Sequence, residues 1–110
     1  MGIKVKTMVS QHYKKKRSNR ENFIRKHFGG DGKVIDSFLV NNGHKDGIER
    51  HEVTDKGIIV IYNAASGKLV TKKIGRERQI RRLYENAGKK PPKYLIELAQ
   101  WHNDLRYNSI

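Results

Sequence analysis

The 110-residue chain contains no cysteine, only two prolines and no apolar run of the length that crosses a membrane. The lack of cysteine excludes disulfide bonds and cysteine-ligated metal centres. A membrane-spanning helix needs about 20 mostly apolar residues, so we expect no membrane partner. The first 17 residues also lack the apolar segment of a secretory signal. These absences favour a cytoplasmic location and a single small domain held together by packing.

Acidic residues are scarce relative to basic ones. The chain has 24 Lys and Arg against 11 Asp and Glu, a net charge of +13. Residues 1–33 carry ten basic and two acidic side chains, residues 68–93 carry the same numbers, and residues 34–67 carry three basic and five acidic ones. Such a surface attracts polyanions, of which nucleic acid is the commonest in a cytosol. We therefore predict a nucleic-acid partner. The alternatives are an acidic protein partner and a charge that only maintains solubility.

The N-terminal third of the chain predicts a basic arm followed by a helix. Residues 1–17 are basic and poor in bulky apolar side chains, which indicates a flexible or partly helical arm outside a domain of residues 18–110. Ser18 followed by Glu21 matches a capping box, so the helix is expected to begin there. Its apolar face is predicted to carry Phe23, Ile24, His27 and Phe28.

Four segments of strand composition follow, separated by short loops that contain glycine. They are residues 33–40, 48–54, 58–63 and 68–74. Three consecutive hairpin connections predict an antiparallel meander. The turn at residues 55–57 is compatible with a two-residue or a three-residue loop, so the pairing register stays open.

Two further helices are predicted after the last strand. In residues 76–88 the apolar face consists of Ile80, Leu83, Tyr84 and Ala87, with Gly88 as the stop. In residues 93–107 the apolar stripe consists of Tyr94, Leu98, Trp101 and Leu105, with Leu95 beside it. The sequence therefore predicts an α+β fold: an N-terminal helix, a four-stranded antiparallel meander, and two C-terminal helices packed on the sheet. One face of the sheet is expected to be covered.

A charged cluster, Glu49 to Glu52, stands on the second predicted strand. Alternation along the strand places Glu49, His51 and Val53 on one face. Because Val53 is expected to face the core, His51 lies either partly buried beside Glu49 or at the rim of the sheet. A neighbouring carboxylate fixes the histidine tautomer and stabilises the imidazolium, which suits acid–base chemistry near neutral pH. Judged alone, the segment fits a structural or surface role better.

Basic side chains gather after the fourth strand. Alternation sends Lys72 and Lys73 to opposite faces of the sheet. Arginines at the start of the next helix can each hold two phosphate oxygens, although a solvated helix face is the simpler explanation. The predicted phosphate ligands here are Lys73, Arg76, Arg78, Arg81 and Arg82. Further nucleic-acid contacts are predicted in the arm, at Lys14, Lys15, Lys16 and Arg17.

The sequence has no metal-binding motif, no nucleotide-binding glycine loop and no serine nucleophile motif, so we expect no metal and no cofactor. The residue inventory suits metal-free cleavage of RNA, since RNA carries its own nucleophile in the 2′-hydroxyl. This favours RNA over DNA. Glu49 or His51 would act as base or acid, and Lys73 with an arginine of residues 76–82 would bind the phosphate. Thr54 or Thr71 could add a hydrogen bond to the phosphate.

Residues 48–84, "IERHEVTDKGIIVIYNAASGKLVTKKIGRERQIRRLY", resemble a group of small uncharacterised proteins from phages and mobile elements of Gram-positive bacteria. With "VIDSFLVNNGHKDG" upstream, the resemblance covers residues 33–85 and extends to the barnase–EndoU–colicin–RelE superfamily of metal-independent ribonucleases. It implies that His51 and Thr54 are site residues and that Arg76 is a phosphate ligand. The basic arm and the last helix depart from the pattern.

The leading hypothesis is thus a nucleic-acid-binding protein of phage or mobile-element type that acts as a metal-independent endoribonuclease. The catalytic residues would be His51, Glu49, Thr54 and Arg76. A non-catalytic RNA- or DNA-binding module and an adaptor that docks an acidic protein partner are the alternatives. The oligomeric state stays open.

Overall fold

The computed structural model describes the backbone of residues 11–41, 43 and 47–108, and the side chains of residues 20–41, 43 and 47–105. Its elements are α2 (Gln11–Phe28), β1 (Val34–Asn41), β2 (Ile48–Thr54), β3 (Ile58–Asn63), β4 (Leu69–Ile74), α3 (Glu77–Asn86) and α4 (Lys93–Asn108). The strands form one antiparallel sheet in the order β1-β2-β3-β4. The predicted α+β class and meander are confirmed. None of the helices in this part of the chain is long and apolar enough to span a bilayer.

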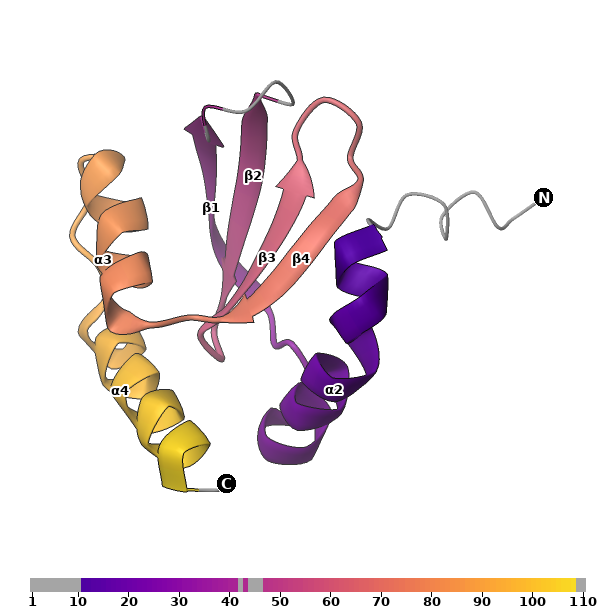
Figure 1. Ribbon diagram of the computed structural model, residues 1–110. Coiled ribbons are helices and arrows are strands. Elements are labelled where there is room, and N and C mark those ends of the chain that lie inside the picture. Colours follow the sequence, from indigo (N-terminus) through magenta and orange to yellow (C-terminus); the bar gives the residue numbers. More distant parts are fainter. Residues whose placement is uncertain (1–10, 42, 44–46, 109–110) are drawn as a thin grey trace.

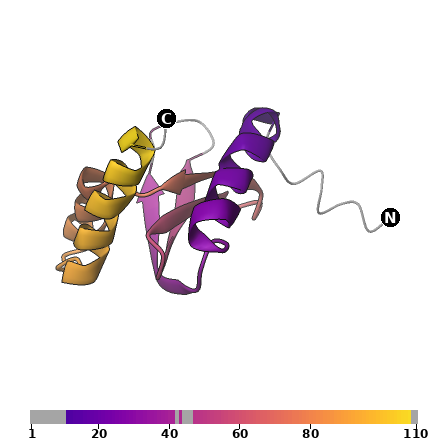
Figure 2. The same cartoon turned by 90° about the horizontal axis from the view of Figure 1, so that it is seen from below.

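Helices cover both faces of the sheet. α3 and α4 lie side by side on one face and α2 lies on the other (Figure 1), and Figure 2 shows the sheet between these two helical layers. The prediction that only one face is covered is therefore wrong. The reason lies in β3, where Ile58 and Val60 pack against α2 while Ile59 and Ile61 pack against α3 and α4. A strand that is apolar at consecutive positions needs cover on both faces.

The β2–β3 turn settles the register. Gly57 donates its backbone N–H to the carbonyl of Thr54, at 3.0 Å, and adopts a φ of +76° that favours glycine. The loop therefore has three residues, with glycine in the left-handed position. The Thr54 hydroxyl accepts hydrogen bonds from the backbone N–H groups of Lys56 and Ile58, each at 3.2 Å. These bonds close the turn around a buried threonine.

The N-terminal helix is longer than predicted. α2 begins at Gln11, so Ser18 lies inside the helix and is not its N-cap. Residues 11–17 contain neither glycine nor proline and are rich in Lys and Arg, which favour helix. The helix therefore extends from Ser18 towards the N-terminus as far as Gln11. The expected arm therefore contributes residues 11–17 to the backbone of α2, and residues 1–10 lie outside the described residues. Ile24 and Phe28, from the predicted apolar face, are buried.

The buried stripe of α4 differs from the predicted one. Tyr94 and Trp101 are about half exposed, at 47% and 49%, whereas the buried residues are Leu95, Ile96, Ala99 and His102. The helix is thus rotated by about one position from the expected orientation. Its small and aliphatic face approaches the sheet, and the amphipathic rings flank the contact, as tyrosine and tryptophan often do. Trp101 still packs against Phe28 of α2, with ring centroids 5.8 Å apart.

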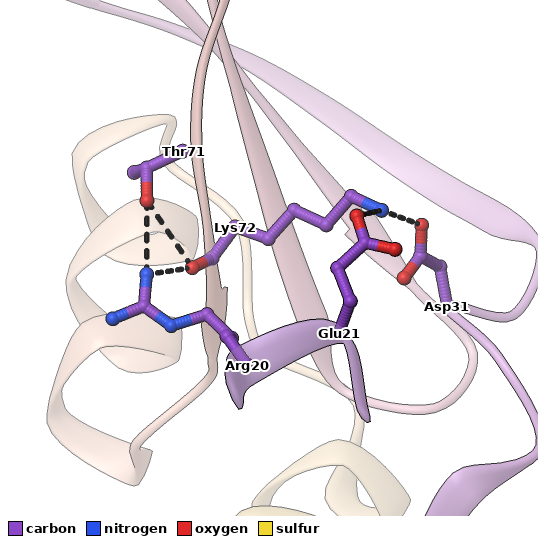
Figure 3. A network of polar contacts seen from close by, with 5 residues as sticks. All are labelled: Arg20, Glu21, Asp31, Thr71 and Lys72. Carbon is purple, nitrogen blue, oxygen red and sulfur yellow. Dashed lines mark hydrogen bonds and ion pairs between the residues drawn. The ribbon is translucent and has the colours of Figure 1, made fainter. Parts of the chain in front are cut away.

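A polar network fastens α2 to β4 (Figure 3). The Lys72 ammonium lies 3.1 Å from Glu21 Oε1 and 2.8 Å from Asp31 Oδ2. Arg20 donates hydrogen bonds to the Thr71 hydroxyl, at 2.9 Å, and to the backbone carbonyl of Lys72. Burial lowers the pKa of Lys72, but the hydrogen bonds and charges of Asp31 and Glu21 outweigh it and raise the pKa above its ordinary value. The predicted split of Lys72 and Lys73 between the two faces is confirmed, and Lys72 serves the α2 contact.

Candidate functional site: a cationic pocket between the sheet and α3

A pocket of about 780 Å³ lies between the sheet and α3. Its apolar lining comes from Phe38, Val40, Ile59, Ile61 and Leu83. Its cationic and titratable lining comes from His51, Lys73, Arg82 and Lys89. Amide side chains are supplied by Asn41, Gln79 and Asn86. No carboxylate of the described residues lines the pocket, so its field is positive and favours an anionic ligand.

The sheet register explains why residues far apart in sequence meet in the pocket. His51 on β2 is paired with Phe38 on β1 and with Ile61 on β3. On the other side of β3, Lys73 is paired with Ile59. Because alternate residues of a strand share a face, these side chains all point towards α3 and α4.

His51 is held by the carboxylate predicted to accompany it. His51 Nε2 lies 3.0 Å from Glu49 Oε1, and the two side chains are only 14% and 18% exposed. Of the two alternatives open in the sequence, the structure has the partly buried pair. A hydrogen-bonded carboxylate fixes the orientation of the imidazole. Since His51 lines the pocket and Glu49 does not, the pair presents the imidazole ring to a ligand.

Lys73 and Arg82 approach the pocket from two different elements. Lys73 projects from the edge strand β4, and Arg82 projects from α3. Within the described part of the chain, neither forms an ion pair with a carboxylate. Both charges are therefore available to an incoming anion. An arginine can hold two phosphate oxygens at once, whereas a lysine acts as a compact point charge.

Lys89, just beyond the end of α3, completes the cationic lining. Its ammonium lies 3.8 Å from Asp36 Oδ1 and 5.7 Å from the centre of the Phe38 ring. The other oxygen of Asp36 accepts a hydrogen bond from the buried Tyr84 hydroxyl. Burial raises the pKa of Tyr84, and the hydrogen bond and charge of Asp36 raise it further, so the hydroxyl keeps its proton. This chain of contacts fixes the end of α3 over β1.

The other predicted phosphate ligands lie outside the pocket lining. Arg76 is exposed and precedes α3, where its backbone N–H donates to Gln79 Oε1 at 3.0 Å. Arg78 is also exposed, and Arg81 forms an ion pair with Glu77 at 2.8 Å. The predicted ridge of three arginines is thus divided, because only Arg82 lies on the side of α3 that lines the pocket.

Thr54 and the basic residues of the arm also stand apart from the pocket. Thr54 is buried and lies three positions from His51, on the opposite face of β2, where its hydroxyl closes the turn. Thr71 is a buried residue of β4 and accepts a hydrogen bond from Arg20. The side chains of Lys14, Lys15, Lys16 and Arg17 lie outside the described residues.

Sequence reasoning missed five polar residues of the lining: Ser37, Asn41, Gln79, Asn86 and Lys89. Three positions of α3 offered a signal, because Gln79, Arg82 and Asn86 recur at the spacing of one helical face. That polar row lies beside the apolar row containing Leu83. Asn41 and Lys89 had no comparable signal. Asn41 ends β1 and Lys89 lies in the loop after α3, so only the tertiary structure brings both to the pocket.

Across the part of the chain that the structure describes, no group of three or more His, Asp or Glu side chains is placed to hold a metal ion. A scan against protein-family models found no match, and searches of curated proteins and of solved structures found none of significance. The likeness to the ribonuclease superfamily therefore stays a prediction from the sequence.

Proposed function

We propose that this protein binds RNA in the pocket between the sheet and α3 and cleaves it without a metal ion. The observation that carries the proposal is the meeting of His51, Lys73 and Arg82 in one pocket whose described lining residues include no carboxylate. Phosphate needs cations, and cleavage next to a 2′-hydroxyl needs a proton acceptor at the same place. The hypothesis of a phage or mobile-element origin rests only on the sequence resemblance.

The roles follow from the positions of the side chains. His51, with Nε2 held by Glu49, uses its other ring nitrogen to take the proton of the 2′-hydroxyl. The 2′-oxygen then forms a bond to phosphorus while the bond from phosphorus to the 5′-oxygen breaks. The departing oxygen takes a proton from water, leaving a 2′,3′-cyclic phosphate and a 5′-hydroxyl. Lys73 and Arg82 stabilise the extra negative charge on the phosphate oxygens as the new bond forms.

The test is cleavage of a labelled RNA in the presence of EDTA. We expect His51→Ala to lower the cleavage rate by roughly 10²–10⁴-fold, the usual contribution of general acid–base catalysis. Removal of one cation, in Lys73→Ala or Arg82→Ala, should cost roughly 10²–10³-fold. Arg78→Ala is the matched control, because Arg78 is an exposed arginine of the same helix outside the lining.

Three outcomes separate the hypotheses. A substrate with 2′-deoxyribose at the cleaved position should bind but stay intact, since it lacks the nucleophile. If wild-type protein retains RNA without cleaving it, the pocket belongs to a non-catalytic binding module. If it retains neither RNA nor DNA at low salt, both nucleic-acid functions are excluded. Thermal unfolding of each variant checks that a lost activity does not reflect a lost fold.

A further inference from the structure

The two edges of the sheet differ in how they are protected. At the β4 edge, Arg20 of α2 donates a hydrogen bond to the backbone carbonyl of Lys72. The strand also carries two lysines, and its pairing with β3 is irregular near Tyr62 of β3. Such devices discourage the addition of another strand. β1 has no lysine or proline, and among the described residues only β2 is paired with it. Its irregularity is confined to Val34–Asp36, which leaves a regular edge over residues 36–41.

The cationic pocket extends to this free edge. Phe38 and Val40 face α3, whereas Ser37, Leu39 and Asn41 alternate towards the opposite face of the sheet. All five residues nevertheless line the pocket. Residues of both orientations can do so only where the pocket reaches the strand edge, with its outward backbone N–H and C=O groups. Lys89 lines the same pocket, with its ammonium 5.7 Å from the centre of the Phe38 ring.

The two sides of the β1 edge have different chemistry. On the α3 side, an added strand would meet the positive pocket of Lys73, Arg82 and Lys89. On the other side it would meet exposed aliphatic side chains, above all Leu39 at 72% exposure, with Ile48 at 41% on the neighbouring strand. A strand has side chains on both faces, so a matching partner alternates acidic and aliphatic residues.

We propose that the free edge of β1 binds an extended acidic segment of another protein, which adds as a fifth strand and places its carboxylates in the cationic pocket. Backbone hydrogen bonds to residues 36–41 supply affinity, and the alternating side chains supply specificity. Charge decides against a second copy of this chain, because two molecules of +13 repel each other. If the pocket cleaves RNA, such a partner is an inhibitor; this consequence, unlike the docking itself, rests on the proposed function.

The probe for the test is the blocked peptide acetyl-(Glu-Val)4-amide carrying a fluorophore, with binding followed by anisotropy in the absence of RNA. We expect saturable binding to the full chain. A peptide of the same composition in two blocks, four Glu and then four Val, should bind at least about tenfold more weakly, because it cannot serve both sides of the edge. Equal binding of the two peptides would overturn strand addition.

N-methylation separates strand addition from simple charge attraction. In an extended peptide all Glu N–H groups point to one edge and all Val N–H groups point to the other. Methylation of one set should therefore abolish binding, while methylation of the other set leaves it nearly unchanged. If both methylated peptides bind as well as the parent, the backbone of the peptide plays no part and the inference fails.

Protein variants locate the peptide. Lys89→Glu should weaken peptide binding by about tenfold, while its neighbour Lys90→Glu, with the same charge change outside the lining, should have a much smaller effect. Leu39→Glu should also weaken peptide binding, because it removes the most exposed aliphatic side chain of the β1 edge and adds a negative charge there. Equal effects of Lys89→Glu and Lys90→Glu would place the peptide elsewhere on the basic surface and refute the assignment.

The outcomes are independent of the RNA experiments. If His51-dependent RNA cleavage is found but the peptide does not bind, the docking edge is refuted and the proposed function stands. If the peptide binds as described but RNA is neither bound nor cleaved, the proposed function fails and the edge remains a protein-docking site. Sedimentation experiments test whether the protein self-associates. If it does, and Leu39→Glu abolishes the self-association, the edge binds a second copy of this chain and the inference is wrong.

Discussion

His51 and Thr54 lie three residues apart on β2, yet they face opposite sides of the sheet. His51 lines the cationic pocket beside Glu49, whereas the buried Thr54 accepts two backbone hydrogen bonds in the β2–β3 turn. The family resemblance pairs the two residues in one site. The alternation of a strand separates them, so their proximity in sequence does not imply a shared role.

Thr54→Val tests this separation at the residue scale. Valine keeps the shape of threonine but leaves the buried N–H of Ile58 without its acceptor. We expect the free energy of unfolding to fall by about 1–3 kcal/mol and RNA cleavage per folded molecule to stay unchanged. Chemical denaturation measures the first quantity. Thr54→Ser, which retains the hydroxyl, is the control. If the Thr54→Val protein folds but does not cleave RNA, Thr54 has a catalytic role and the separation is wrong.

At the scale of elements, α2 depends on a polar contact as well as on apolar packing. Ile24 and Phe28 bury its apolar face, while Lys72 of β4 bridges Glu21 of α2 and Asp31 just beyond it. Sequence periodicity predicted the apolar face of this helix. It could not predict its start, because a capping motif at Ser18 competes with residues that themselves favour helix.

Lys72→Met tests the polar contact. The substitution keeps the aliphatic stem and removes the ammonium that contacts Glu21 and Asp31, so we expect the free energy of unfolding to fall by about 1 kcal/mol at neutral pH after allowance for solvent screening. Because the folded-state pKa of Lys72 is raised above 10.5, the wild-type advantage is fully present below that pH. It is lost as the pH rises through the raised pKa. Denaturation curves of both proteins should therefore converge in strong base; a constant difference would contradict the ion-pair explanation.

For the whole molecule, the +13 charge predicts general attraction for polyanions, and the pocket predicts where the attraction becomes specific. Affinity for single-stranded RNA should fall steeply with salt. Each phosphate contact contributes about 0.7 to the slope of log affinity against log salt concentration. We expect Lys73→Met and Arg82→Met each to reduce the slope by about that amount. Lys90→Met, the removal of an exposed charge outside the lining, should leave it nearly unchanged. Equal slopes in all variants would show that binding uses the general surface charge and not the pocket.

Local sequence patterns determined the four strands, their antiparallel order and the placement of His51 and Glu49 on one face of β2, because each depends on neighbours within a few residues or across a short turn. Tertiary structure alone decided that α2 covers the second face of the sheet and that α4 turns Ala99 and His102 inward in place of Trp101. It also decided that Arg82 and Lys89, and not Arg76, join Lys73 around His51. These features depend on how helices pack against a finished sheet, where small rotations of α3 and α4 change which side chains meet.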